Sequence, residues 1–311
     1  MTPHTPSATP PVDPRHADPR HVERMLRLAS AASVFVAVLL IVVKAVAWQM
    51  TDSVSMLASL VDSSMDAAAS LISFVAIRYA LVPADREHRF GHGKAEAVAA
   101  LVQAAFIAGS AAFLVLHAAE RLQYPVTVHD TNTGIGVMVF SIVVTAALVL
   151  LQRRAIRVTG STAIRADSLH YVGDLLVNVS IIIALLAAAA GHMAVDAWFG
   201  IGIAVYIAWS AWGIAAQALD HLLDREADDT VREQILQLAR NHPGVIGVHD
   251  LRTRLSGQQL FVQMHLELDR DMPLWQAHEV AEGVENAIRG HFPGSDVIVH
   301  EDPAPLPAGP G

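Results

Sequence analysis

The stretch LVDSSMDAAASLI, residues 60–72, places two aspartates inside a segment that otherwise has the composition of a membrane-spanning helix. The polar residues of this segment recur every three or four positions, which puts them on one face of an α-helix. They are Ser55, Ser59, Asp62, Asp66, Ser70 and Ser73. Because the other faces are apolar, we expect both aspartates to point into a protein interior rather than into lipid.

A second apolar segment, residues 163–190, repeats this pattern with Asp167, His170, Asp174 and Asn178. His170 and Asp174 are one helical turn apart on one face, as Asp62 and Asp66 are. If the two helices run antiparallel, His170 lies nearer Asp66 and Asp174 lies nearer Asp62. The sequence therefore predicts four convergent nitrogen and oxygen ligands.

Three carboxylates in one intramembrane cluster require compensation, because a charge at mid-bilayer costs about 2.5 to 3.5 kcal/mol on insertion scales. A divalent cation supplies it, and four such ligands suit tetrahedral Zn²⁺, with Fe²⁺ and Cd²⁺ close in ligand preference. When the metal leaves, some of these groups should bind protons. Metal release and proton uptake are then linked.

The rest of the composition also indicates a membrane protein. Of 311 residues 53% are hydrophobic, and the mean hydropathy is +0.41. Six stretches are each roughly 20 residues or longer, enough to cross a hydrocarbon core. We expect these six transmembrane helices near residues 28–48, 53–79, 95–118, 134–152, 163–190 and 194–218.

The loops predict the orientation of the chain. Lys and Arg gather in the loops after the second and fourth spans, and such loops are usually cytoplasmic. Both termini should therefore be cytoplasmic, with a transmembrane domain at residues 25–219. The Pro- and His-rich residues 1–24 and the final residues 303–311 are expected to be disordered.

Residues 220–302 have the composition of a soluble domain with 7 Lys and Arg against 16 Asp and Glu, a net charge of −9. This charge repels nucleic acid and attracts cations. Helical periodicity at 229–241 and 274–290, a β-hairpin over 245–269 and a strand at 297–300 predict a small α+β layer domain.

Two further groups of residues could bind metal. The chain has no cysteine, so imidazole and carboxylate are its strong ligands. The second loop carries Asp85, His88 and His92 between flexible glycines, and the soluble domain carries a second group. That group is His249, His265, His278, His300 and Asp302. Exposed histidines without a ligand remain an alternative interpretation for both.

These segments together resemble the cation diffusion facilitator family, closely its bacterial iron and zinc efflux branch, from about residue 25 to 302. The motifs are SVSMLASLVDSSMD (53–66), PADREHRFGHGKAE (83–96), IRADSLHYVGD (164–174), HDLRTR (249–254) and PGSDVIVHEDP (293–303). The resemblance implies six membrane helices, a ferredoxin-like cytoplasmic domain and a homodimer in the bacterial inner membrane. It also implies export of Zn²⁺, Fe²⁺ or Cd²⁺ from the cytoplasm against proton entry.

The resemblance also implies roles for individual residues. Asp62, Asp66, His170 and Asp174 match the family's transport and proton-coupling site. Asp85, His88 and His92 match a loop site, and the five residues of the soluble domain match a structural or regulatory zinc site at a dimer interface. Lys94 and Asp224 match an inter-subunit salt bridge, and Leu169 matches a hydrophobic gate. A histidine at position 170 favours zinc, cadmium and iron over manganese.

Two other functions fit parts of the sequence. An intramembrane zinc hydrolase would need an open metal position and a general base, and the chain has no HExxH motif. A metal-regulated cation channel would bind its ion weakly, whereas a cage of four ligands holds it tightly. Neither alternative is preferred, and no enzymatic activity is expected.

Overall fold

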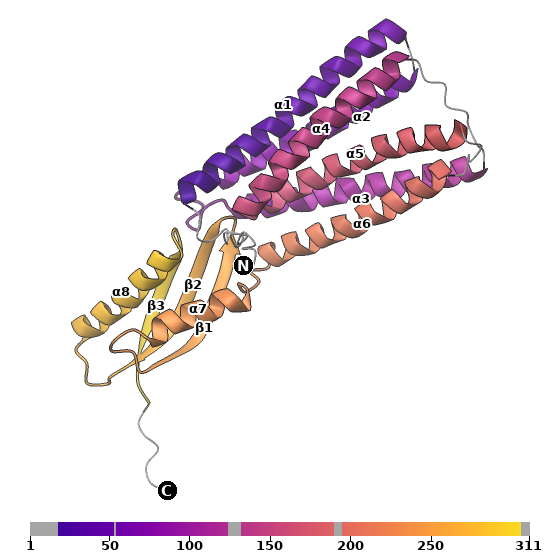
Figure 1. The fold of residues 1–311 in the computed structure, drawn as a ribbon. Helices are drawn as coiled ribbons and strands as arrows, with labels where there is room; N and C mark the ends of the chain where they lie inside the picture. Colours follow the sequence, from indigo (N-terminus) through magenta and orange to yellow (C-terminus); the bar gives the residue numbers. More distant parts are fainter. Residues whose placement is uncertain (1–17, 53, 124–131, 190–194, 306–311) are drawn as a thin grey trace, which may run out of the picture.

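The computed structural model describes residues 18–52, 54–123, 132–189 and 195–305. Six long helices form a bundle, and a smaller domain of helices and strands lies at one end of it (Figure 1). The long helices are α1 (Pro19–Thr51), α2 (Val54–Ala80), α3 (Lys94–Gln123), α4 (Asn132–Thr159), α5 (Thr162–Ala189) and α6 (Val195–Leu222).

Within the described residues, five helices, α1 to α4 and α6, are long and apolar enough to cross a membrane. The helix α5 has a similar length but carries Arg165, Asp167 and Asp174 in its first half. It packs against α3, α4 and α6, so its polar face meets protein. These features agree with the predicted helical membrane domain.

Small residues allow the helices to pack closely. The most extensive contact joins α3 to α6, where Ala100 and Ala104 lie in one buried cluster with Ala211 and Ala218. Small side chains let two helix backbones approach each other, which favours association within a membrane.

The helix α1 begins earlier than the sequence pattern predicts. It starts at Pro19, with the Asp18 carboxylate accepting a hydrogen bond from the Arg20 amide. Val22 and Leu26 are buried in a cluster with Ile77 of α2. Residues 19–24 therefore belong to a helix rather than to a disordered tail, because a cap and apolar contacts hold this turn. Residues 1–17 and 306–311 lie outside the described part of the chain.

The C-terminal domain has the predicted α+β order. Its elements are α7 (Asp229–Arg240), β1 (Gly247–Ser256), β2 (Gln259–Leu268), α8 (Leu274–His291) and β3 (Asp296–Pro303). The sheet has the order β1-β2-β3, antiparallel between β1 and β2 and parallel between β2 and β3. Both helices pack on one sheet face over a core that includes Ile235, Met264 and Ile288.

The turn between β1 and β2 contacts the start of α3. A Cβ atom added to Gly93 would lie 2.3 Å from the carbonyl oxygen of Ser256, so only glycine fits there. Beside this contact, the Arg254 guanidinium lies 4.9 Å from the ring centre of Phe90 and 4.5 Å from that of Phe261. The cytoplasmic domain therefore touches the loop between α2 and α3 directly.

Candidate metal sites

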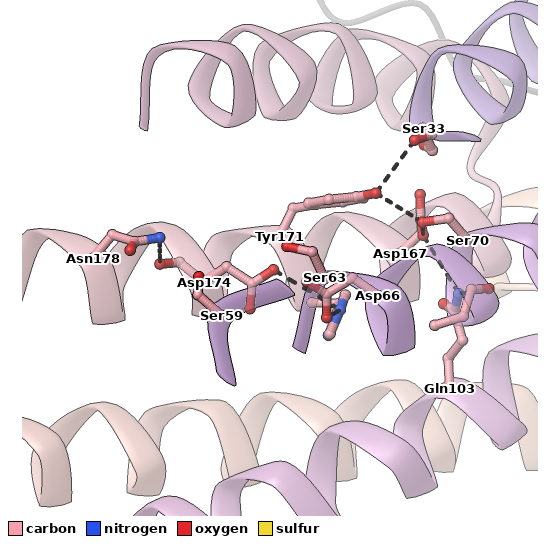
Figure 2. A network of polar contacts seen from close by, with 12 residues as sticks. Ser33, Ser59, Ser63, Asp66, Ser70, Gln103, Asp167, Tyr171, Asp174 and Asn178 are labelled. Atoms are coloured by element: carbon pink, nitrogen blue, oxygen red, sulfur yellow. Dashed lines mark hydrogen bonds and ion pairs between the residues drawn. The ribbon is translucent and has the colours of Figure 1, made fainter. Parts of the chain in front are cut away.

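The first candidate site lies between α2 and α5, inside the bundle. Nε2 of His170 is 2.8 Å from Oδ1 of Asp66 and 3.9 Å from Oδ2 of Asp174. These three residues can each offer one ligand atom within 4.8 Å of the others. Figure 2 shows Asp66 and Asp174 approaching each other from the two helices. As the antiparallel arrangement predicts, His170 faces Asp66.

The fourth predicted ligand, Asp62, lies outside this group of three. It is one turn from Asp66 on α2, and its side chain is exposed. Next to it, the ammonium group of Lys44 donates hydrogen bonds to the Ser63 hydroxyl at 2.6 Å and the Ser59 carbonyl at 3.3 Å. Lys44 therefore links α1 to α2.

Asp167 belongs to a separate polar cluster, although its position in the sequence suggested the same polar face. Its carboxylate accepts hydrogen bonds from Ser70 at 2.9 Å, Gln103 at 3.5 Å and Gln152 at 2.8 Å. Neither glutamine was identified from the sequence. Gln103 interrupts an apolar stretch of α3, and that exception to the pattern is the signal that could have found it. Gln152 is followed directly by Arg153 and gives no such signal.

Leu169, the predicted gate residue, is buried beside His170. It lies in the cluster that contains Ile207 of α6 and the alanines of α3. The structure thus places an apolar contact directly next to the intramembrane histidine.

The second candidate site is in the loop between α2 and α3. Asp85 lies 3.4 Å from Nδ1 of His88 and 3.3 Å from Nε2 of His92. Nδ1 of His92 donates to the carbonyl of Val82 at 3.2 Å, which leaves Nε2 free to bind a metal. Backbone hydrogen bonds, first from His88, lower the pKa of Asp85 and keep it ionised.

The third candidate site spans the sheet of the cytoplasmic domain. Register places His249 opposite His265 and His265 opposite His300, one histidine on each strand. The Asp302 carboxylate lies 2.8 Å from Nδ1 of His265 and 3.5 Å from Nε2 of His249. The hydrogen bond from His265 lowers the pKa of Asp302, followed by attraction to the neighbouring histidines.

This site gathers three of the five predicted residues, namely His249, His265 and Asp302. His300 is close, with its Nε2 3.3 Å from Asp302, but lies outside that group, as does His278 on α8. His265 is half-exposed on the sheet face away from buried Met264.

Lys94 and Asp224 form a salt bridge at 3.0 Å within one chain, whereas the family resemblance implied a bridge between subunits. Arg254 also reaches Asp224, at 3.3 Å. Although partial burial opposes ionisation, the hydrogen bonds from Lys94 and Arg254 lower the pKa of Asp224. This cluster links the start of α3 to the cytoplasmic domain.

Comparison with known proteins adds an independent line of support. Residues 30–223 match the model of the cation efflux transmembrane domain, and residues 227–304 match that of the cation efflux protein cytoplasmic domain. The cation-efflux pumps FieF of Yersinia pestis (strain Pestoides F) and Yersinia pseudotuberculosis (serotype O:3, strain YPIII) are each 48% identical over 286 residues. Each alignment covers 92% of this chain and 95% of the relative.

Two solved structures align with part of the chain. The nickel form of a MamM CTD variant is 30% identical, covering 25% of this chain and 100% of that one, with a TM-score of 0.24. The manganese form of another MamM CTD variant is 32% identical, covering 24% and 98%, also with a TM-score of 0.24.

Proposed function

This chain belongs to the cation efflux family, and from that membership we propose that it exports Zn²⁺, Fe²⁺ or Cd²⁺ from the cytoplasm in exchange for protons. The substrate passes through the membrane domain without chemical conversion, so we expect no enzymatic turnover. We place the protein in a bacterial inner membrane with both termini cytoplasmic, since Lys and Arg gather in the loops next to the cytoplasmic domain.

The observation that carries this proposal is the meeting of Asp66, His170 and Asp174 between α2 and α5. One imidazole and two carboxylates are ligands that divalent zinc and iron accept. Asp62, one turn away, supplies the fourth ligand when the metal enters. The same four groups carry protons when the metal leaves, because close carboxylates cannot all stay ionised.

Exchange requires access from each side of the membrane in turn. Leu169 and the apolar cluster around it would close the path on one side of His170 while the other side is open. A site that faces both sides at once would dissipate the gradient, so a gate of this kind is needed for coupled transport.

The other two groups would bind metal without carrying it across. Asp85, His88 and His92 would hold a metal in the loop that touches the cytoplasmic domain. His249, His265 and Asp302, with His278 and His300, would hold Zn²⁺ where two copies of the chain meet, and this would stabilise a homodimer. The match to the family's cytoplasmic dimer domain supports this part of the proposal.

The test is zinc flux into proteoliposomes of the purified protein, measured with and without an imposed pH gradient. We expect flux driven by the gradient in the wild-type protein and none in Asp66→Ala. Ser64→Ala is the matched control, because Ser64 lies on the exposed face of the same helix. Flux that ignores the gradient would contradict antiport, and wild-type flux in Asp66→Ala would contradict the site.

A further inference from the structure

The side chain of Asp167 lies where helices α1 to α5 approach one another, and only 2% of the residue is exposed. The side chains that hydrogen-bond to it, Ser33, Ser70, Gln103 and Gln152, are all neutral. Among the residues that the structure describes, none forms an ion pair with Asp167. A buried carboxylate without a cation is costly, and such a group usually becomes neutral by binding a proton.

A chain of oxygen atoms connects this carboxyl group to α1 (Figure 2). Oδ1 of Asp167 is 2.9 Å from the Ser70 hydroxyl, which is 2.9 Å from the Tyr171 hydroxyl. The Tyr171 hydroxyl lies 3.3 Å from the backbone carbonyl oxygen of Ser33. The chain therefore contains three oxygen–oxygen contacts at hydrogen-bond distance.

The number of protons that these oxygen atoms carry decides how many of the three contacts can be hydrogen bonds. Ser70 and Tyr171 each carry one hydroxyl proton, and the Ser33 carbonyl carries none. If Asp167 is ionised, only two protons are available for the three contacts, so one contact has no hydrogen bond. A proton on Asp167 is the third, and every contact is then a hydrogen bond.

We propose that Asp167 is a proton-binding site inside the membrane, distinct from the metal ligands. Its proton sets the direction in which the hydrogen bonds run along this chain of oxygen atoms. With the proton bound, Asp167 donates to Ser70, Ser70 donates to Tyr171, and Tyr171 donates to Ser33 on α1. Without it, Tyr171 donates to Ser70 and Ser70 donates to Asp167, so the contact with α1 is released.

The basic side chains nearest to Asp167 along its own helix, His170 and Arg165, have other hydrogen-bond partners. On α2 the nearest titratable group is Asp66, one turn from Ser70, and it is hydrogen-bonded to His170. On α5 the charged neighbours are His170 and Arg165, and Arg165 is exposed and bonded to Gln217 of α6. Ser33, Gln103 and Gln152 are the groups offered by α1, α3 and α4, and none of them ionises. Further along these helices lie Asp62, Asp174, Lys44 and Glu96, and Lys44 is bonded to Ser63. On α6, His221 lies 3.4 Å from Thr162.

Infrared spectroscopy of the full-length, metal-free protein in proteoliposomes at neutral pH tests the proposal. A protonated carboxyl group has a carbonyl stretch that an ionised carboxylate lacks. We expect one component of this band in the wild-type protein to be missing in Asp167→Asn, whose amide can still donate to Ser70. Any protonated aspartate of the metal-free transport site contributes to the band in both proteins, so the test is the difference between them. Asp52→Asn is the control, because Asp52 is exposed at the end of α1 and asparagine tolerates its left-handed backbone.

A second variant, Tyr171→Phe, tests the same proposal if Asp167→Asn does not fold. Tyr171→Phe removes the acceptor of the Ser70 proton, so the band of the protonated Asp167 should shift in frequency. An unchanged band in Asp167→Asn, or an unshifted band in Tyr171→Phe, would overturn the proposal. The measurement uses no metal, so a failure of zinc transport would leave its result intact.

Discussion

His170 is the residue on which the choice of metal depends. It is the one nitrogen ligand among the aspartates of the membrane site, and its Nε2 lies between Asp66 and Asp174. Nitrogen ligands favour zinc, whereas a site made only of oxygen ligands suits manganese.

We predict that His170→Asp shifts transport from Zn²⁺ toward Mn²⁺. Competition between the two metals in proteoliposome flux would measure this change, with His21→Asp, an exposed histidine in the first turn of α1, as the control. An unchanged order of preference in His170→Asp would mean that selectivity is set elsewhere in the protein.

Asp224 gives the stability of the protein a pH dependence outside the membrane. Its pKa is lower in the folded protein than the ordinary value of 3.8, so its salt bridges stabilise the fold above that pH and are lost as the pH falls below it. Both partners are partly exposed, so we expect Asp224→Asn to cost less than about 1 kcal/mol at neutral pH.

Thermal unfolding in detergent, from neutral pH downward, would measure the difference in unfolding temperature between the wild-type protein and Asp224→Asn. We expect the difference to narrow as the pH falls below 3.8. Asparagine tolerates the left-handed backbone of residue 224. Asp271→Asn, an exposed change in the same domain, should show no such trend.

At the level of elements, the contact between the β1–β2 turn and the start of α3 connects the two domains. Gly93 leaves no room for a side chain against the backbone of Ser256. The loop group Asp85, His88 and His92 precedes this contact by a few residues, so a shift of the turn would also move the loop.

We predict that Gly93→Ala separates the turn from α3 and weakens metal binding at the loop group several-fold. Gly109→Ala, in the helix α3 that follows Gly93 but with no atom within 4 Å of the added carbon, should bind as the wild-type protein does. Calorimetric titration of both variants with zinc would compare them. Equal affinity in Gly93→Ala and Gly109→Ala would show that the loop does not depend on this contact.

At the level of the whole molecule, we expect metal binding in the cytoplasmic domain and metal transport through the membrane site to be separable by mutation. His265 faces Asp302 and His249 on the sheet, far along the chain from His170. We predict that His265→Ala binds less zinc per chain and forms a weaker dimer, while the membrane site still transports zinc.

Mass measurement of the detergent-solubilised protein with and without zinc would follow the dimer, and proteoliposome flux would follow transport. Gln263→Ala is the matched control, because Gln263 is exposed two residues away on the same strand. A zinc-dependent dimer that persists in His265→Ala would contradict the proposed role of this site.

Much of the fold could be predicted because its signals are local. The helical spacing of Asp62 with Asp66 and of His170 with Asp174 placed each pair on one face. The helices and strands of the cytoplasmic domain lie close to their predicted ranges. The start of α1 was missed because the Pro- and His-rich composition obscured the cap at Asp18.

The sequence by itself determined which residues share a face, since a helix or a strand repeats its side-chain directions at a fixed period. Only the tertiary structure decided which of those faces meet. It brought His170 to Asp66, left Asp62 outside their group, and placed Asp167 among Gln103 and Gln152 instead. The physical reason is that these contacts join helices far apart in the chain, and their rotation and depth are set by packing against neighbouring helices rather than by local spacing.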